Sequence, residues 1–509
     1  MTNLTDLLPA GAGGKQVSFT ADGSISIGDT VVLQSDGTVK IAGFSTATLD
    51  AVEGEFNDAS SSGSNVNAQS SLRALYKPDE DRVYFFWGYS STIYYSSATY
   101  NGTSWTFATP TSSGKNASNN QSGLGLDVVY DTSQNKGIIV WEDGTGYAFR
   151  SARVALLTFS GTTVTWLSNG SQLDYYSLFP SVATDNNGTF LVVYENTPNN
   201  QAYLYKGVIS GTGVSFYGPN VINSNGGYWT QYPVIYVPEK QRYLALTQNS
   251  SGGLVCNVIE DTGGTNIPTV RSNDSISNLA SGGNEYKDLC WDAESERVLI
   301  FGKNSSPYPC VQSCTFTATS NSVTQSGSPV VLKSAALANQ VYALKAEYNR
   351  DSKQTFVAMS FTSTSTPSQY VVVSGTTPTV DVSATNLYSD TTNTFQDLTS
   401  GGTGTGRVYI GLYGSQTSGS FTANDGYAQT YSMPLSNFAD FIGIADAAIS
   451  DTASGNITIK GGIAANGLSS LTPGSTYYVQ SDGTLSTTSS SVTAGKALSA
   501  TSINLDYSS

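Results

Sequence analysis

The hydrophobic positions of this chain fall in short alternating runs that come in pairs, with a polar turn between the two runs. In the clearest pair, the run Leu126–Asp131 is followed by four polar residues and by a second apolar run that ends at Trp141. β-Branched and aromatic residues with a period of two, separated by a few turn residues, are typical of antiparallel strands. The pair therefore predicts a β-hairpin.

The same pair recurs along the chain at an almost constant spacing. Alignment of the turns gives intervals of 54, 54, 53, 54 and 57 residues. The six aligned positions are Lys77, Asp131, Asp185, Pro238, Asp292 and Asn349. A weaker seventh copy spans 395–413, and two further strand-like runs follow the pair in the first three copies. This pattern predicts an all-β fold, a seven-bladed β-propeller of four-stranded antiparallel blades.

The repeats are expected to fill 66–435, between an N-terminal β module with a linker (1–65) and a C-terminal β module (436–509). Residues 54–70 are rich in Gly, Ser and Asn and are interpreted as a linker or long loop. The stretches 28–40 and 474–486 match at seven of thirteen positions without gaps, so the two terminal modules are expected to be related. A strand near residue 66 or one near residue 430 is expected to close the ring.

Composition excludes several classes of function. Net charge is −15, from 23 basic and 38 acidic residues, without a basic stripe, so no nucleic-acid partner is expected. The sequence has no run of about 18 apolar residues, so no membrane insertion is expected, and residues 1–9 do not resemble a secretory signal. Histidine is absent, which removes the commonest general base and metal ligand.

Four cysteines are present, and they are interpreted as small buried hydrophobic residues: Cys256, Cys290, Cys310 and Cys314. Cys310 and Cys314 are expected to share one face of a strand, because their separation is even. A zinc site is disfavoured by the spacing and by the lack of histidine. A disulfide between two of them stays open, with no pairing indicated.

The two ends of the chain carry a resemblance to a known class. Residues 3–15, Asn-Leu-Thr-Asp-Leu-Leu-Pro-Ala-Gly-Ala-Gly-Gly-Lys, resemble the start of virion proteins from tailed phages of marine bacteria, cyanophages in particular. The stretches 441–445, 471–480 and 494–501 are similar to modules in the same kind of protein, and so are the repeats. The resemblance implies a tail fibre, another tail-associated appendage or a capsid-attached appendage, and it brings no catalytic residues with it.

Aromatic residues outside the repeat register are the candidate ligand contacts. Aromatics that recur in register before or at the end of strands, such as Phe179, Tyr232 and Trp141, are expected to pack between blades. Loops of a propeller face often carry ligand sites, and flat rings suit the C–H faces of sugars. The predicted glycan contacts are Tyr175, Tyr176, Tyr228 and Trp229, with Asn223 and Gln231 as nearby hydrogen-bonding groups; the alternative is that they cover loop backbone or contact another protein.

Other charged groups give no convincing enzymatic or metal site. A glycosidase would need two carboxylates held together, and Glu142, Asp143 and Glu195 qualify only by type. Sialidase-like propellers use an arginine cluster, which is not visible here: four arginines open second strands in register (Arg82, Arg242, Arg297 and Arg407), and only Arg150 and Arg153 lie outside the register. Asp residues in the turns, and the acidic stretches 79–81 and 185–188, are explained by turn chemistry rather than Ca²⁺.

These observations predict a non-enzymatic phage virion structural protein without cofactor or metal, exposed on the extracellular particle after assembly in the host cytoplasm. Its terminal modules would contact other virion proteins, a homo-oligomer, with a trimer favoured, would form by analogy with fibres, and the propeller would adhere to a host-surface glycan. The alternatives are capsid or tail decoration without a receptor role and, less favoured, a propeller-type glycoside hydrolase.

Overall fold

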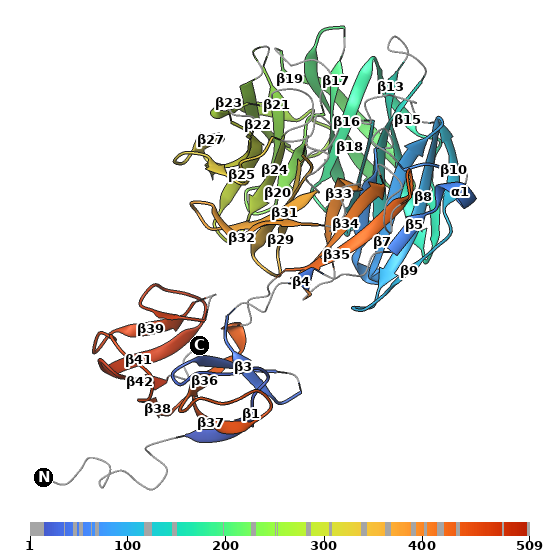
Figure 1. The fold of residues 1–509 in the computed structure, drawn as a ribbon. Coiled ribbons are helices and arrows are strands. Elements are labelled where there is room, and N and C mark those ends of the chain that lie inside the picture. Colours follow the sequence, from blue (N-terminus) through green and yellow to red (C-terminus); the bar gives the residue numbers. More distant parts are fainter. Residues whose placement is uncertain are drawn as a thin grey trace, which may run out of the picture. The chain divides into compact units, whose positions relative to one another are not determined.

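The computed structural model describes most of the chain and shows a molecule built almost wholly of β-strands (Figure 1). The described residues are 15–34, 36–43, 48–49, 54–62, 64–66, 71–116, 125–144, 150–196, 198–224, 231–249, 251, 253–280, 287–304, 308–336, 344–361, 368–387, 393–401, 405–414, 422–433, 438–480 and 483–505. Within them the helices are α1 (Ala59–Ser62), η2 (Pro78–Glu80) and η4 (Phe438–Asp440). None is long and apolar enough to cross a membrane.

The chain divides into two compact units, residues 48–433 and residues 1–47 together with 434–509. We call them the ring unit and the terminal unit. The terminal segments thus fold together, whereas the sequence suggested two separate modules at 1–65 and 436–509.

The described part of the ring unit forms six hydrogen-bonded antiparallel sheets. The first contains β6 (Arg73–Lys77), β7 (Arg82–Tyr89), β8 (Thr92–Tyr100), β9 (Trp105–Phe107) and β10 (Thr111–Asn116). The second contains β11 (Leu126–Asp131), β12 (Lys136–Asp143), β13 (Ser151–Ser160), β14 (Thr163–Trp166) and β15 (Ser171–Tyr175). The third contains β16 (Ser177–Thr184), β17 (Thr189–Asn196), β18 (Gln201–Ser210) and β19 (Gly213–Asn223).

A nine-stranded sheet follows, made of two runs of strands. The first run is β20 (Val234–Val237), β21 (Arg242–Gln248), β22 (Gly253–Glu260) and β23 (Thr269–Ala280). The second run is β24 (Asp288–Asp292), β25 (Arg297–Lys303), β26 (Pro309–Thr317), β27 (Ser322–Gln325) and β28 (Val330–Val331). A single residue pair, Ala280 with Lys303, joins the two runs.

The last two sheets complete the ring unit. One contains β29 (Leu344–Asn349), β30 (Gln354–Met359), β31 (Gln369–Ser374) and β32 (Thr379–Asn386). The other contains β33 (Asn393–Gly401), β34 (Arg407–Gly414) and β35 (Gly426–Ser432), with β4 (Thr48–Leu49) and β5 (Gly54–Asn57) from the start of the chain. The prediction of an all-β chain with four-stranded antiparallel sheets is confirmed.

The predicted hairpin at 126–141 forms as the alternation indicated. β11 pairs with β12 from Leu126 opposite Trp141 to Asp131 opposite Lys136. The Asp131 carboxylate accepts the N–H of Gln134 at 3.0 Å, and Asn135 has a φ of 51°. A carboxylate that accepts turn amides, with Asn in the left-handed region, fixes the reversal of the chain.

The first strands of successive runs contact one another in a closed series. β6 contacts β11, and the contacts continue through β16, β20, β24, β29 and β33, which contacts β6 again. Each first strand has one sheet edge, where unpaired N–H groups would be costly. Aspartates of three first strands satisfy such groups on the next strand: Asp127 accepts Val182 N–H at 2.9 Å, Asp288 accepts Ala346 N–H at 2.8 Å, and Asp397 accepts Ala74 N–H at 2.9 Å.

The hydrophobic core of the ring unit lies between neighbouring sheets. One cluster joins Tyr84 and Phe86 of β7 to Ile139 and Trp141 of β12. The in-register aromatics follow this arrangement, since each of the following is at most 1% exposed: Trp87, Trp141, Phe179, Tyr194, Tyr232 and Phe301.

The closing strands lie earlier in the chain than expected. β5 pairs with β35, with Glu55 opposite Tyr427 and Gly54 opposite Ala428. The Phe56 ring stacks on Phe85 with centroids 4.4 Å apart. Burial of this aromatic side chain explains why a stretch interpreted as a linker forms a strand followed by α1.

The terminal unit combines strands from both ends of the chain in two five-stranded sheets. One contains β1 (Gln16–Thr20), β37 (Ser454–Ile459), β36 (Phe441–Ala445), β2 (Thr30–Leu33) and β3 (Val39–Ile41) in that order. The other contains β38 (Ile463–Ala464), β42 (Ser502–Leu505), β41 (Thr493–Ser499), β39 (Thr476–Val479) and β40 (Leu485–Ser486).

The two related stretches form equivalent hairpins in this unit. Gln34 N–H donates to Thr38 O and Gln480 N–H donates to Thr484 O, both at 2.8 Å. Gly37 and Gly483 have φ angles of 85° and 82°, which a residue without a Cβ adopts at little cost.

The four cysteines are buried and none forms a disulfide. Cys256, Cys310 and Cys314 lie in one apolar cluster between β22 and β26, as the even spacing of the last two suggested. Burial raises the pKa of the Cys314 thiol to about 12, so these side chains serve as packing groups.

Candidate functional site

Two predicted glycan contacts, Tyr175 and Tyr176, stand at the exposed end of β15. Tyr175 is 67% exposed, the largest value among the large hydrophobic side chains of the described residues, and Tyr176 is 39% exposed. Tyr175 pairs with Ser151, and the Tyr176 N–H donates to Arg150 O at 2.8 Å with a Tyr176 φ of 63°. The strand end is therefore fixed by backbone bonds while both rings reach the surface.

A carboxylate next to this pair is held by the neighbouring sheet. Asp174 Oδ2 accepts the Tyr194 hydroxyl at 3.3 Å. The Asp174 carbonyl accepts the Ser177 hydroxyl at 2.7 Å, and Ser177 Oγ in turn accepts the Ala152 N–H at 2.5 Å. These bonds tie β15, β13 and β17 together at one point.

Two further tyrosines stack around this point. The Tyr194 ring lies 5.9 Å from Tyr203 and 6.1 Å from Tyr205 between centroids, with interplanar angles of 22° and 18°. Burial, and then the charge of Asp174, raise the pKa of the Tyr205 hydroxyl, which stays protonated as a hydrogen-bond donor.

We call Asp174, Tyr175, Tyr176, Tyr203 and Tyr205 the tyrosine patch. Its members are the exposed rings at the end of β15, the Asp174 acceptor, and the two rings stacked on Tyr194. Rings and carboxylates of this kind suit the C–H faces and hydroxyl groups of a sugar. Sequence reasoning missed three of its members, although Tyr203 and Tyr205 alternate along β18 and so share one face. Because they lie on a predicted strand rather than in a loop, the search for loop aromatics passed over them.

The other predicted contacts have different outcomes. Tyr228 and Trp229 lie outside the described residues. Asn223 and Gln231, expected beside them as hydrogen-bonding groups, are each only 8% exposed. Asn223 donates to Thr247 Oγ1 at 3.0 Å and Gln231 donates to Pro180 O at 3.4 Å, so they bond within the ring unit.

The carboxylates considered for a glycosidase serve as partners of arginines. Glu142 is 1% exposed and lies 3.7 Å from Arg150, and Asp143 pairs with Arg153. Arg150 and Arg153 therefore pair with different carboxylates. Glu195 is fully buried.

The in-register arginines and turn carboxylates also have local partners. Arg242 pairs with Glu260 at 2.6 Å, and Arg407 lies over the Tyr100 ring at 5.2 Å. Asp185 accepts the N–H of Asn187 at 2.8 Å, and Asp79 pairs with Lys77 at 2.5 Å. These contacts agree with the interpretation that the in-register arginines and the acidic turn residues stabilise the fold.

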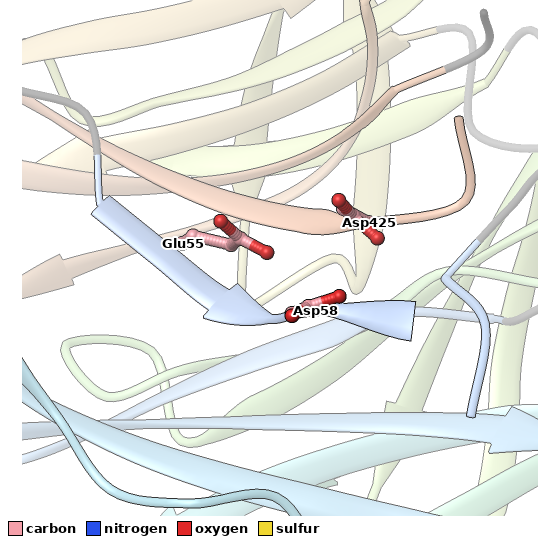
Figure 2. Close-up of side chains that lie close together, drawn as sticks. All are labelled: Glu55, Asp58 and Asp425. Atoms are coloured by element: carbon pink, nitrogen blue, oxygen red, sulfur yellow. The ribbon is translucent and has the colours of Figure 1, made fainter. Parts of the chain in front are cut away.

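Three carboxylates gather where β5 meets β35: Glu55, Asp58 and Asp425 (Figure 2). One oxygen from each lies within 4.8 Å of the others. Asp58 accepts the Ser60 N–H and Asp425 accepts the Ala59 N–H, at 2.8 and 2.7 Å, so both cap the start of α1. Burial, and then the charges of Asp425 and Asp58, raise the pKa of Glu55 to about 7. We assign no ion to this group.

Comparisons with known proteins give distant similarities only. No protein-family model and no curated protein matches the chain. A protein of solved structure from Lactobacillus plantarum is 14% identical over 69% of this chain and 99% of its own, with a TM-score of 0.45. The fucose-specific lectin from Aleuria aurantia is 12% identical over 64% of this chain and 98% of its own, with a TM-score of 0.38. A variant of the NanB sialidase from Streptococcus pneumoniae is 14% identical over 76% and 71%, with a TM-score of 0.41. Similarity this low transfers neither a ligand nor an activity.

Proposed function

We propose that this chain is a non-enzymatic structural protein of a phage virion, a tail fibre or other appendage, that binds a host-surface glycan through the tyrosine patch. The observation that carries the binding role is the exposure of Tyr175, at 67%, at the end of a strand whose preceding residue, Asp174, is anchored to Tyr194. A large apolar ring left in water at a rigid strand end suits a contact that is completed by a ligand.

The architecture proposed for the ring unit is a seven-bladed propeller. The closed contact series of first strands supports this, because it passes through seven of them before returning to β6. In this proposal the nine-stranded sheet is two blades joined by one residue pair, and β4 and β5 complete the last blade. A propeller holds binding loops and strand ends rigidly, which suits display at a particle surface.

The terminal unit is proposed as the attachment to the particle and to sister subunits, with a trimer favoured. Its support is the distribution of exposed apolar side chains in the described residues. Of the eleven most exposed ones, six lie in this unit: Val17, Ile27, Leu33, Ile41, Ile463 and Leu498. Apolar groups concentrated on a small unit indicate a surface that is covered in an assembly. The resemblance of the chain ends to phage virion proteins points to the same place.

Binding at one tyrosine patch would be weak, and many copies on one particle would supply avidity. The second candidate function is decoration of the capsid or tail without a receptor role. The exposed apolar side chains of the terminal unit favour it without any contribution from the tyrosine patch. The patch and the terminal unit can therefore be tested separately.

The test is binding of purified full-length protein to immobilised lipopolysaccharide of the host on which the phage grows. Tyr175→Ala with Tyr176→Ala is expected to reduce binding by about tenfold or more, since aromatic anchors commonly contribute over 1.4 kcal/mol. Ile267→Ala, which removes another exposed apolar side chain of the ring unit (46% exposed), is the matched control. Equal binding of all three proteins would reject the patch, and release of free sugar during the incubation would reject the non-enzymatic assignment.

A further inference from the structure

The ring unit contains an open cavity of about 650 Å³, and no residue of the tyrosine patch lines it. Its walls come from the first strands of the closed series, including β6, β11, β16, β20, β24, β29 and β33. A volume between about 300 and 1,000 Å³ is usual for small-molecule sites. The cavity is therefore large enough for a ligand.

One register position of the first strands lines this cavity in six of the seven runs of strands; the residue of the seventh run, Arg73, pairs with the lining Asp127. In each run, the position is found by counting four residues back from the last residue of the first strand that pairs with the second strand, or bonds to it across the turn. The seven residues are Arg73, Asp127, Ser181, Pro233, Asp288, Lys345 and Asp397. We call them the axial layer. Positions that only pack between sheets keep apolar residues in all repeats, whereas this position carries cations, anions, a hydroxyl and an imino acid.

The charges of the axial layer are arranged around two cations. Lys345 Nζ lies 3.9 Å from Asp288 Oδ2 and 3.9 Å from Asp397 Oδ1. Arg73 Nε lies 3.3 Å from Asp127 Oδ1, and Arg73 Nη2 donates to Gln231 Oε1 at 3.3 Å. The arginine thus links the first sheet to the segment that enters β20.

Hydrogen-bonding capacity is left over in this layer. At 3.9 Å from its carboxylates, Lys345 makes ion pairs but no hydrogen bond with any described residue, so its ammonium donors face the cavity. Ser181 lines the cavity, is 2% exposed, and its hydroxyl has no hydrogen-bond partner among the described residues. A buried hydroxyl without a partner is destabilising, and a bound polar group would supply the missing hydrogen bond.

Aromatic side chains form the wall nearer the turns of the hairpins. Each comes from the last residues of a different first strand: Tyr76, Tyr130, Tyr236, Trp291 and Tyr348. Thr132, Asn186 and Arg350, which belong to the hairpin turns, line the same cavity. The lining thus combines aromatic and hydrogen-bonding groups, which suit the C–H faces and the hydroxyl groups of a sugar ring.

The charge balance selects among sugars. Four carboxylates line the cavity (Asp127, Asp288, Asp397 and Glu347), and the lining cations are Lys345 and Arg350. This excess disfavours an anionic sugar. Lys345, which lies 3.9 Å from both Asp288 and Asp397, and Arg350 line the same cavity, which disfavours a cationic sugar. Hydroxyl groups can accept from Lys345 and donate to a carboxylate at the same time.

We propose that the axial cavity is a second binding site, one that takes a neutral saccharide ring. This site would extend carbohydrate binding to the centre of the ring unit. The proposal does not depend on glycan binding by the tyrosine patch. A particle-bound protein with both sites would hold a branched or long glycan at two points.

The experiment uses full-length protein carrying Tyr175→Ala and Tyr176→Ala, so that the patch cannot contribute. Isothermal titration is done with methyl glycosides of glucose, galactose, mannose, fucose and N-acetylglucosamine, with glucuronate and glucosamine as the charged probes. At least one neutral glycoside is expected to bind once per chain. Lys345→Met is expected to weaken it about tenfold or more, since a hydrogen bond to a charged group contributes about 1.5–3 kcal/mol. Ser181→Val, added singly, is expected to weaken it about two- to tenfold, since a hydrogen bond between neutral groups contributes less.

Several results would overturn the proposal: no neutral probe binds, a charged probe binds more tightly, or both cavity variants bind unchanged. Ile267→Ala serves as the matched surface variant. If Lys345→Met fails to fold, hydrogen exchange of the protein saturated with the neutral probe replaces it, and the amides of β6, β29 and β33 are expected to exchange more slowly. Exchange that does not change would reject the site. The two measurements report on the two sites separately. Lipopolysaccharide binding that is lost in the tyrosine double variant, while axial binding is kept, shows that one site can fail without the other.

Discussion

The ring unit and the terminal unit differ in how far apart in the chain their paired strands lie. In the ring unit each sheet forms from consecutive strands, and only β4 and β5 come from far away, to pair with β35. In the terminal unit β1, β2 and β3 share one sheet with β36 and β37, so the whole sheet depends on both ends of the chain. Local pairing builds most of the first unit, and long-range pairing builds the second.

The two units also differ in what they leave exposed. In the ring unit, apolar side chains are mostly covered by the neighbouring sheet, and Tyr175 is the strongest exception. The terminal unit is smaller but leaves six large apolar side chains exposed. In a closed series, each sheet buries its apolar faces against its neighbours. A small unit of two sheets buries a smaller share of its apolar surface, and the rest is available to partners.

The largest expected effect tests whether the units unfold separately. Phe56→Ala removes the 1%-exposed ring that stacks on Phe85, and it is expected to destabilise the ring unit by about 3–5 kcal/mol. Phe441→Ala, at a 2%-exposed position of the terminal core, is expected to lower the other transition by a similar amount. Differential scanning calorimetry checks both, and one shared shift for the two variants would show that the units are coupled.

The related hairpins of the terminal unit offer a sharper comparison. Gly37→Ala and Gly483→Ala both place a side chain at a positive φ, but an added Cβ meets nothing within 4 Å at Gly37. At Gly483 it would lie 1.9 Å from the Ala42 carbonyl oxygen. We expect about 1 kcal/mol of destabilisation at Gly37 and about 1–3 kcal/mol more at Gly483, measured by urea unfolding. Equal losses of stability in the two variants would mean that the backbone around Ala42 shifts to accommodate the added methyl group.

Removal of an axial carboxylate tests how the ring unit satisfies its inner strand edges. Asp397→Ala leaves the Ala74 N–H without its acceptor, and a loss of about 1–3 kcal/mol is expected. Asp288→Ala, which frees Ala346 N–H, should behave alike. Chemical denaturation measures both, and a stability equal to that of the unchanged protein would show that water replaces the carboxylate.

The smallest effect concerns pH and the closing strand. The pKa of Glu55 is raised from 4.5 to about 7 in the folded chain by burial and by Asp425 and Asp58. The folded state therefore binds more protons than the unfolded state between about pH 4.5 and 7, and stability falls as pH rises through this window. Glu55→Gln should flatten this slope and slow hydrogen exchange at β35 above pH 7.

Glu296→Gln is the matched control for Glu55→Gln, since the Glu296 side chain is 66% exposed in a hairpin turn of the same unit. A thermal-denaturation series from pH 4 to 8 compares the three proteins. A slope that persists in Glu55→Gln would assign the pH dependence to other groups.

Much of the fold could be predicted from the chain, and less of the site. The hairpins, their turn residues and the burial of Trp87, Trp141 and Tyr194 follow from alternation and period. Tyr175 and Tyr176 could be predicted as candidates because they lie outside the register. Asp174, Tyr203 and Tyr205 could not, because their contacts with Tyr194 depend on the approach of β15 to the third sheet. The axial layer was also missed, since residues in register were assigned to packing.

The sequence by itself determined the strands, the turns and the repeat, because these depend on hydrogen bonds and side-chain alternation within about fifteen residues. Only the tertiary structure decided that Phe56 closes the ring unit, that both chain ends share one sheet, and that six dissimilar residues line one cavity. Those outcomes join residues tens to hundreds of positions apart. They are set by which edges and apolar faces remain uncovered once the local strands have formed.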